Sequence, residues 1–286
     1  MLSPLSDLEP RRPRVGHIQF LNCLPLYYGL VESGTLLDVD LRKDTPDRLN
    51  ERLLSGDLDI GPISAAEYLR HADELLVLPD LAVGSDGPVQ SVCLVSERPP
   101  AELDGGRVAL GSTSRTSVLL ARMILEDRYA VRPTYFDCPP DVGAMLMEAD
   151  AAVVIGDVAL RARRDAERLG LHCLDLGAEW RDWTGLPMVF AVWAVRRDFA
   201  DSHPGQVKDV HEAFRRSLDS SLRQVDDIAE RAARWEPFTA AELAAYFRAL
   251  DFRLGPPQLA GLAEFARRAA ARGFLPSGVT PEFVQV

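Results

Sequence analysis

Short apolar runs of strand length alternate along much of the chain with segments whose apolar residues recur at helical spacing. The strand patterns lie at 15–20, 37–42, 58–63, 75–81, 90–96, 107–110, 133–137, 151–155 and 188–196. The helix patterns between them lie at 25–33, 47–55, 64–71, 115–127 and 139–149. This alternation predicts an α/β fold built on parallel sheets.

From His203 onward the pattern is helical, with breaks at Pro237, at 255–257 and at Gly273. Two α/β units joined by two strand crossings, with a helical tail that returns to the first unit, predict a two-lobe fold with a hinged cleft. We expect the first lobe to comprise 1–93 and 196–286 and the second lobe to comprise 94–195. A ligand would then bind between the lobes.

The segment Gly111–Ser117, with the sequence Gly-Ser-Thr-Ser-Arg-Thr-Ser, follows a strand pattern and opens a helix pattern. The first amides of a helix lack intrahelical acceptors and carry partial positive charge, so such a turn favours an anion. One serine, Ser112 or Ser114, can be an ordinary helix N-cap, which leaves the other hydroxyls unexplained. The turn has neither the Gly-Lys-[Ser/Thr] of a P-loop nor a Gly-x-Gly-x-x-Gly run. We therefore expect a small carboxylate to bind Gly111, Ser112, Thr113, Ser114, Arg115 and Thr116.

A formal net charge of −11 over 286 residues argues against nucleic acid or an anionic membrane as partner, because both attract a concentrated positive face. The amino-terminal segment has proline and acidic residues where a signal peptide needs an apolar stretch, so we expect a cytoplasmic protein. The four cysteines and five histidines are dispersed without metal-binding or Cys-x-x-Cys spacing. We accordingly expect reduced thiols, no metal and no cofactor.

Three polar residues occupy positions where ligands of open α/β sheets bind. Asn22 follows the strand pattern 15–20, and its amide can cap the next helix or offer a donor and an acceptor to a ligand. Ser64 begins a helix pattern and can form a capping box with Glu67, which is compatible with a place in the cleft. Ser91 begins the first crossing, where its hydroxyl either reaches a cleft ligand or stays at the strand edge.

Two later segments complete the candidate site. Gly156 and Asp157 follow the strand pattern 151–155. Asp157 can cap a helix, or it can act as an acid, a base or a hydroxyl acceptor across the cleft. The segment 180–187, Trp-Arg-Asp-Trp-Thr-Gly-Leu-Pro, predicts an aromatic loop before the second crossing, either merely packed or forming a wall for a planar ring.

Five of these segments, taken together, resemble the chorismate dehydratase family of the futalosine route to menaquinone. They are Phe20-Leu21-Asn22-x-x-Pro25-Leu26, Asp59-Ile60-Gly61-x-Ile63-Ser64, the turn Gly111–Ser117, Ile155-Gly156-Asp157 and Thr184-Gly185-Leu186-Pro187. Their order and spacing are specific, and the resemblance covers about residues 14–270. A sister family in the same pathway acts on cyclic de-hypoxanthine futalosine, and its amino-terminal turn differs from the one here.

The resemblance implies a type II periplasmic-binding-protein fold and the conversion of chorismate to 3-[(1-carboxyvinyl)oxy]benzoate with loss of water. It implies catalytic roles for Asn22, Ser91 and Asp157. The implied substrate contacts are Ser64, the residues Gly111 to Thr116, Gly156 and Thr184. The alternatives are a cytosolic solute-binding protein for a small carboxylate and the sister enzyme. We expect a monomer or homodimer that binds neither nucleic acid nor a membrane.

Overall fold

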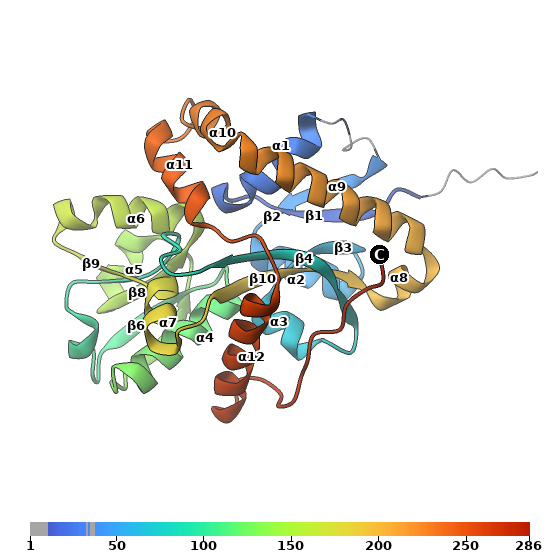
Figure 1. Cartoon of the computed structure of the whole chain (residues 1–286). Coiled ribbons are helices and arrows are strands. Elements are labelled where there is room, and N and C mark those ends of the chain that lie inside the picture. The colour runs from blue at the N-terminus through green and yellow to red at the C-terminus, as the bar shows by residue number, and fades with distance from the viewer. Residues whose placement is uncertain (1–10, 33, 35–37) are drawn as a thin grey trace, which may run out of the picture.

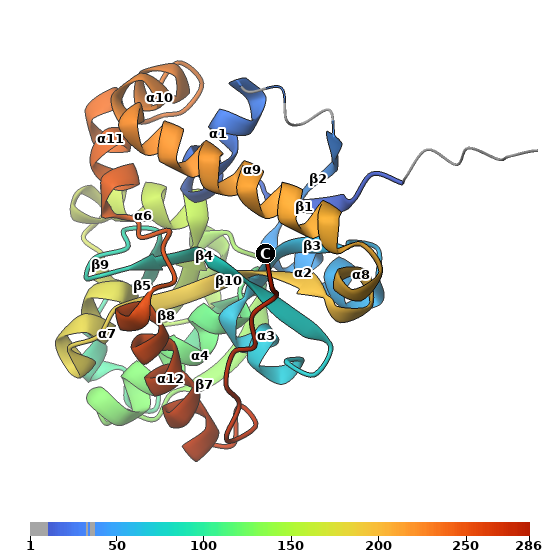
Figure 2. The ribbon, with the colours of Figure 1, turned by 45° about the vertical axis from the view of Figure 1, so that its right-hand side comes forward.

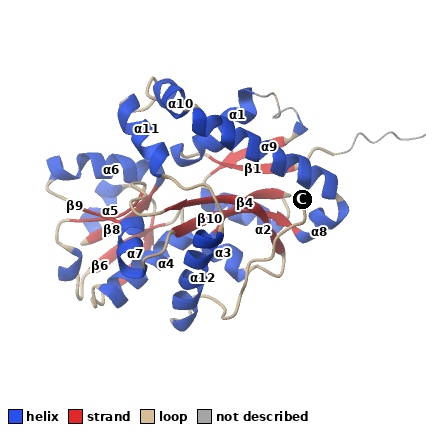
Figure 3. Cartoon of the chain, in the orientation of Figure 1, coloured by secondary structure: helices blue, strands red, loops and turns tan. Residues whose placement is uncertain are grey.

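The chain folds into two mixed β-sheets, each covered by helices, as Figure 1 and Figure 3 show in the same orientation. The computed structural model describes residues 11–32, 34 and 38–286. Each sheet has five strands, and the cleft lies between the sheets. The predicted two-lobe α/β fold is therefore confirmed.

The first sheet has the strand order β2-β1-β3-β10-β4. Its strands are β1 (Arg14–Ile18), β2 (Asp40–Asp44), β3 (Ile60–Ser64), β4 (Leu75–Ser85) and β10 (Met188–Arg196). Strand β1 pairs in parallel with β2 and β3, whereas β10 is antiparallel to both of its neighbours. The connecting helices are α1 (Leu24–Glu32), α2 (Pro46–Ser55) and α3 (Ala65–Arg70). Proline at the first turn and Gly56 in the left-handed region set the two ends of α2.

The second sheet repeats this plan with the order β7-β6-β8-β5-β9. Its strands are β5 (Val92–Ser96), β6 (Arg107–Gly111), β7 (Thr134–Cys138), β8 (Ala151–Ile155) and β9 (His172–Asp175). Strand β5 is antiparallel to β8 and β9, and the others are parallel to one another. The helices are α4 (Arg115–Met123), which continues into a π-helical turn (Ile124–Arg128), α5 (Val142–Glu148), α6 (Gly156–Leu169) and α7 (Leu176–Thr184). A short 3-10 turn (Pro100–Glu102) precedes β6.

The carboxyl-terminal helices bind the two lobes together. They are α8 (Arg197–Ser202), α9 (Pro204–Arg223), α10 (Val225–Ala232), α11 (Ala240–Ala249) and α12 (Pro256–Ala271). Helix α9 packs so closely on α1 that a Cβ at Gly29 would lie 2.8 Å from the Ser217 backbone. Figure 2 shows α9 beside α1, with α12 on the other side of β10. Helix α12 also reaches the second lobe, where Phe265 contacts Trp180.

The strand pairing differs from the sequence prediction at the lobe boundaries. The sequence indicates that 94–195 forms the second lobe, but β10 pairs entirely within the first sheet. At the other boundary all of β5, including Val92 and Cys93, belongs to the second sheet. A continuous apolar run predicts a buried strand without naming its partners, so the pattern could not assign β10 to a sheet. The chain crosses between the sheets at 86–91 and returns at 185–187.

The first crossing is fastened by the buried carboxylate of Asp175. Its Oδ1 accepts hydrogen bonds from the Val89, Gly177 and Ala178 amides, at 3.0, 3.0 and 3.1 Å. Its Oδ2 accepts the Gln90 amide at 2.7 Å. Gln90 has a φ of +64°, a conformation that side-chain-bearing residues rarely adopt. Asp175 therefore caps α7 and holds a strained residue of the crossing at the same time.

We predict that Asp175→Asn lowers the free energy of unfolding by about 1.5–3 kcal/mol, because the amide NH₂ then faces a backbone donor. Urea denaturation measures the change. Asp141→Asn is the matched control, because Asp141 caps α5 through one bond to the Ala144 amide and asparagine caps helices equally well. The control should change stability by less than about 0.5 kcal/mol. Equal effects of the two substitutions would contradict the role given to Asp175.

Candidate active site

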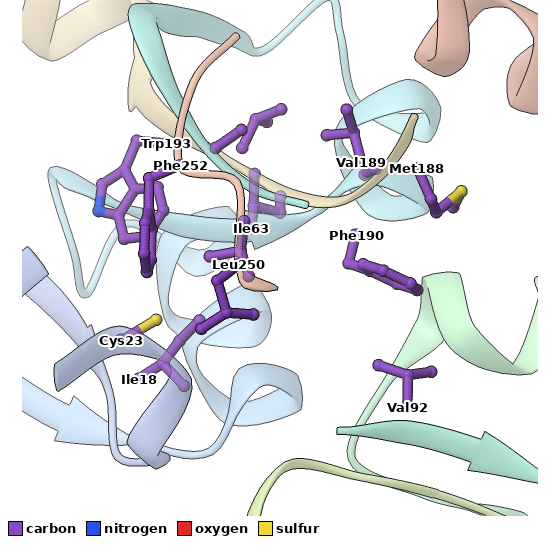
Figure 4. Close-up of a cluster of buried hydrophobic side chains, with 14 of the residues drawn as sticks. Ile18, Cys23, Ile63, Val92, Met188, Val189, Phe190, Trp193, Leu250 and Phe252 are labelled. Atoms are coloured by element: carbon purple, nitrogen blue, oxygen red, sulfur yellow. The ribbon is translucent and has the colours of Figure 1, made fainter. Parts of the chain in front are cut away.

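The cleft is lined where strand-to-helix turns of both lobes meet. These turns connect β1 to α1, β3 to α3, β6 to α4 and β8 to α6, so the carboxyl ends of parallel strands converge on it. The cavity at this place has a volume of about 50 Å³. Its apolar walls include Ile18 and Ile63 from the first sheet, Phe190 from β10 and Val92 from β5, which Figure 4 shows. The space is thus small and largely enclosed by the two lobes.

Every polar side chain in the cleft lining is uncharged. These side chains are Asn22, Asn50, Ser64, Ser91, Ser114 and Ser117. Within the part of the chain that the structure describes, no acidic, basic or histidine side chain lines the cavity. The site therefore offers hydrogen bonds without a formal charge and without a group that titrates near neutral pH.

Asn22 lies in the 3-10 turn Leu21–Cys23 between β1 and α1. Its Oδ1 atom is buried and has no hydrogen-bond partner among the described residues. The side chain therefore does not use this oxygen to cap α1, one of the two interpretations that the sequence leaves open. A buried polar atom without a partner is uncommon, and it is expected where a ligand supplies the missing bond.

Ser64 ends β3 and is held by Asn50 of α2, a residue that the sequence analysis missed. The Ser64 amide donates to Asn50 Oδ1 at 3.0 Å, and Asn50 Nδ2 donates to Ser64 Oγ at 3.3 Å. The alternative capping box does not form, because the Ser64 side chain makes no capping bond and Glu67 pairs with Arg70. Ser64 is buried at the cleft instead.

The turn Gly111–Ser117 divides into cleft residues and structural residues. Ser114 is the N-cap of α4: its Oγ accepts from the Ser117 amide at 3.2 Å and donates to Ser117 Oγ at 2.9 Å. Both serines line the cleft, and Ser117 is an addition to the predicted set. A Cβ at Gly111 would lie 2.7 Å from the Val153 carbonyl oxygen, so this glycine permits the packing of β6 on β8.

The remaining residues of this turn lie outside the cleft lining. Ser112 and Arg115 are exposed, and Thr113 is buried. Thr116 is fully buried, and its Oγ1 accepts a hydrogen bond from the Ala66 amide of α3 at 3.0 Å. Ala66 belongs to the first lobe and Thr116 to the second. The Thr116 hydroxyl therefore joins the lobes across the cleft.

A second bond between the lobes involves Asp157. The Leu21 amide of the first lobe donates to Asp157 Oδ1 at 3.0 Å. Burial raises the pKa of the Asp157 carboxyl above its ordinary value, and the Leu21 hydrogen bond opposes this shift. The Asp157 carboxylate, which the sequence led us to expect at the cleft, is thus already bonded to the Leu21 amide.

Gly156 and Ser91 line the cleft, whereas Asp157 does not. A Cβ at Gly156, which has a φ of +61°, would be 2.7 Å from the Phe20 ring. The Gly156 amide donates to the Ser91 carbonyl oxygen at 2.8 Å, and the Ser91 hydroxyl donates to the Val89 carbonyl oxygen at 3.4 Å. Glycine is required here because Phe20 packs directly on the backbone.

Thr184 and the segment 180–187 do not form the expected wall of the cleft. Residues 180–184 belong to helix α7 and are not a loop, and Thr184 Oγ1 donates to the Trp180 carbonyl oxygen at 2.8 Å. Trp180 is fully buried, and its ring nitrogen donates to the Pro187 carbonyl oxygen at 3.1 Å. The aromatic rings that do line the cleft are Phe20 and Phe190. Both occur in apolar runs, where periodicity cannot separate a core ring from a cleft ring.

Other chemistry near the site is limited in the described residues. His17 stacks on Tyr27 with ring centroids 3.7 Å apart, and burial together with the Lys43 charge lowers its pKa to about 4. Cys23, Cys93, Cys138 and Cys173 are free thiols. Within residues 11–32, 34 and 38–286, no group of three metal-binding side chains comes together. No helix in these ranges has the length and hydropathy needed to cross a membrane.

In a closed form the Ala66 amide bonds to Thr116, and in an open form the lobes would be separated and this bond broken. We predict that Thr116→Val shifts the equilibrium constant between the two forms toward the open form by roughly 5- to 150-fold, because the buried Ala66 amide then has no acceptor in the closed form. Small-angle scattering should show a larger radius of gyration for Thr116→Val. Thr116→Ser keeps the oxygen and should scatter like the unmodified protein. A radius of gyration that is the same for all three proteins would show that this bond does not control closure.

Asp157→Asn should change the pH dependence of stability in a direction fixed by the raised pKa. The folded carboxyl prefers its protonated form, so its contribution to stability is present at low pH and is lost as pH rises through its folded pKa. Asparagine does not ionise, and its oxygen can still accept the Leu21 hydrogen bond. The variant should therefore gain stability relative to the unmodified protein as pH rises above about 4, the ordinary pKa of an aspartate, in urea denaturation. A stability difference that stays constant with pH would refute this assignment.

The chain is similar in sequence to two enzymes of Thermus thermophilus. Chorismate dehydratase of Thermus thermophilus is 32% identical over 271 residues, which cover 89% of this chain and 94% of that protein. The 1,4-dihydroxy-6-naphtoate synthase of the same organism is 28% identical over 265 residues, covering 91% of this chain and 93% of the relative.

The fold itself is shared with binding proteins. A solved structure of a Candida albicans protein, described as having the generic periplasmic binding protein fold, matches with a TM-score of 0.68 at 14% identity. The match covers 96% of this chain and 98% of that chain. Residues 13–271 match the family described as menaquinone biosynthesis, which confirms the resemblance that the motifs indicate. This protein therefore belongs to the menaquinone biosynthesis family.

Proposed function

We propose that this protein is a chorismate dehydratase, a carbon-oxygen lyase that removes water from chorismate to give 3-[(1-carboxyvinyl)oxy]benzoate. The observation that carries the proposal is the cleft lined by uncharged donors and apolar walls, in a chain 32% identical to a protein of that name. The proposed enzyme needs no cofactor or metal. It works in the cytoplasm as a monomer or homodimer.

The substrate matches the chemistry of the cleft. Chorismate has two carboxylates, a hydroxyl at C4 and a proton at C3 that the ring carboxylate acidifies through the diene. Hydroxyl and amide donors of Ser64, Ser117 and Asn22 can bind the carboxylates and stabilise charge that moves onto the ring carboxylate as the proton leaves. Phe20 and Phe190 provide apolar surface for the ring.

The proton at C3 needs a base, and the cleft lining has no titratable side chain among the described residues. We infer that the enolpyruvyl carboxylate of the substrate removes it, because a carboxylate held beside C3 acts at high effective concentration. The electrons of the C3–H bond form the C3–C4 double bond and the C4–O bond breaks. The enolpyruvyl carboxyl group, which holds the C3 proton, passes it to the departing hydroxide, which leaves as water. Asn22 or Ser91 can assist the departure of that hydroxyl, whereas Asp157, which we expected from the sequence to do so, does not line the cavity.

Binding must be accompanied by movement of the lobes. The cavity of about 50 Å³ is well below the roughly 300–1,000 Å³ of ordinary small-molecule sites. Opening would break the bonds from Leu21 to Asp157 and from Ala66 to Thr116, and closure around substrate would remake them. Closure would also exclude water from the developing charge.

A second candidate is the reaction of the relative named 1,4-dihydroxy-6-naphtoate synthase, because the chain is 28% identical to it over nearly its whole length. A third is non-catalytic binding of a small carboxylate by a cytosolic solute-binding protein, which the shared fold permits. Incubation with chorismate and detection of the enolpyruvyl benzoate by mass spectrometry separates these candidates. Product formation that survives exhaustive chelation supports the proposal. Bound but unchanged chorismate favours a binding protein.

Asn22→Asp should lower kcat/KM for chorismate about a hundredfold or more, since it places a negative charge beside a dianion while preserving size. The melting temperature should change little. Gln19→Glu is the matched control, because it adds the same charge at an exposed residue just outside the cleft lining. Near-normal turnover by Asn22→Asp would remove Asn22 from the site.

A further inference from the structure

Asn50 and Ser64 form a buried pair whose hydrogen-bond directions are fixed by the backbone. Both residues are almost inaccessible to solvent, with 4% and 5% exposure. The Ser64 amide can only donate, and it bonds to one end of the Asn50 side chain at 3.0 Å. That end must therefore be the carbonyl oxygen Oδ1. The orientation of the Asn50 amide group follows from this single contact.

The fixed amide determines what the Ser64 hydroxyl can do. The other end of the Asn50 side chain is Nδ2, which lies 3.3 Å from Ser64 Oγ and can only donate. Ser64 Oγ must accept in this bond, so its own hydrogen points elsewhere. Within the described residues, no hydrogen bond is formed in which the Ser64 hydroxyl donates. Ser64 also lines the cleft, which leaves the cavity as the place for that hydrogen.

We infer that Asn50 is a positioning residue that holds Ser64 as a hydrogen-bond donor to a carboxylate of the substrate. The inference rests on the proposed function and adds a determinant of specificity to it. Asn50 Nδ2 occupies one of the two lone pairs of the Ser64 oxygen, so the Ser64 hydrogen cannot point toward Asn50. A group that can only accept, such as a carboxylate oxygen, fits this hydrogen.

The test is a double-mutant cycle on Asn50→Asp and Ser64→Ala, read as chorismate affinity by calorimetry and as KM and kcat. In Asn50→Asp one carboxylate oxygen still accepts from the Ser64 amide. The other oxygen replaces the Nδ2 donor, so the Ser64 hydroxyl turns its hydrogen toward this oxygen and away from the cleft. Repulsion between the new carboxylate and chorismate occurs in both backgrounds and cancels in the cycle. The remaining difference reports the Ser64 donor alone.

We expect Asn50→Asp to raise KM and the dissociation constant about 10- to 100-fold more with Ser64 present than in the Ser64→Ala background. The change in kcat should be smaller, because the bond serves binding. If Asn50→Asp does not fold, Asn50→Leu gives the same comparison by freeing the hydroxyl to rotate. Ser221→Ala is the control, a fully buried serine of α9 outside the cleft lining, and should leave KM unchanged.

The outcomes separate this inference from the proposed function. Turnover of chorismate with equal effects of Asn50→Asp in both backgrounds would overturn the positioning role alone. Binding of chorismate with the expected coupling, but without product, would overturn the dehydratase assignment and leave the positioning role standing. Absence of both binding and turnover by the unmodified protein would overturn both.

Discussion

The closed cleft depends on two backbone amides of the first lobe that find their acceptors in the second. The Leu21 amide bonds to Asp157, and the Ala66 amide bonds to Thr116, each at 3.0 Å. A buried N–H without a partner costs about 1–3 kcal/mol. An arrangement of the lobes that buries these two amides is therefore stable only if Asp157 and Thr116 accept their hydrogen bonds. The same two bonds bring Asn22 and Ser64, which adjoin those amides in the chain, toward the serines of the α4 turn. The site is therefore built from residues of both lobes.

A cleft of uncharged donors suits an anion whose own basicity is needed. An arginine or lysine beside a bound carboxylate would lower the pKa of that carboxylate and weaken it as a base. Hydroxyl and amide donors stabilise the anion with less of this effect, and they are less costly to bury than charged groups. In the proposed reaction the enolpyruvyl carboxylate then remains basic enough to remove the C3 proton.

The two segments that cross between the lobes lead into equivalent strands of the two sheets, and Asp175 holds the first of these segments by hydrogen bonds. In each sheet the fourth strand in order, β10 or β5, is antiparallel and follows a crossing from the other lobe. Asp175 fastens the first crossing through the amides of Val89 and Gln90. Each lobe retains its own sheet, so rotation about the crossings would leave the strand pairing of both sheets intact.

The sequence by itself determined the alternation of strands and helices, a helix start within the turn Gly111–Ser117 and the polar residues Asn22 and Ser64 at strand ends, because periodicity and turn chemistry are local. It also indicated the family, through the order of its motifs. Only the tertiary structure placed β10 in the first sheet and showed that α7 is a helix. It also showed that Asn50 bonds to Ser64 and that Thr116 accepts a hydrogen bond from the Ala66 amide. These pairings connect residues far apart in the chain, and a one-dimensional pattern records that a residue is buried but not what it meets.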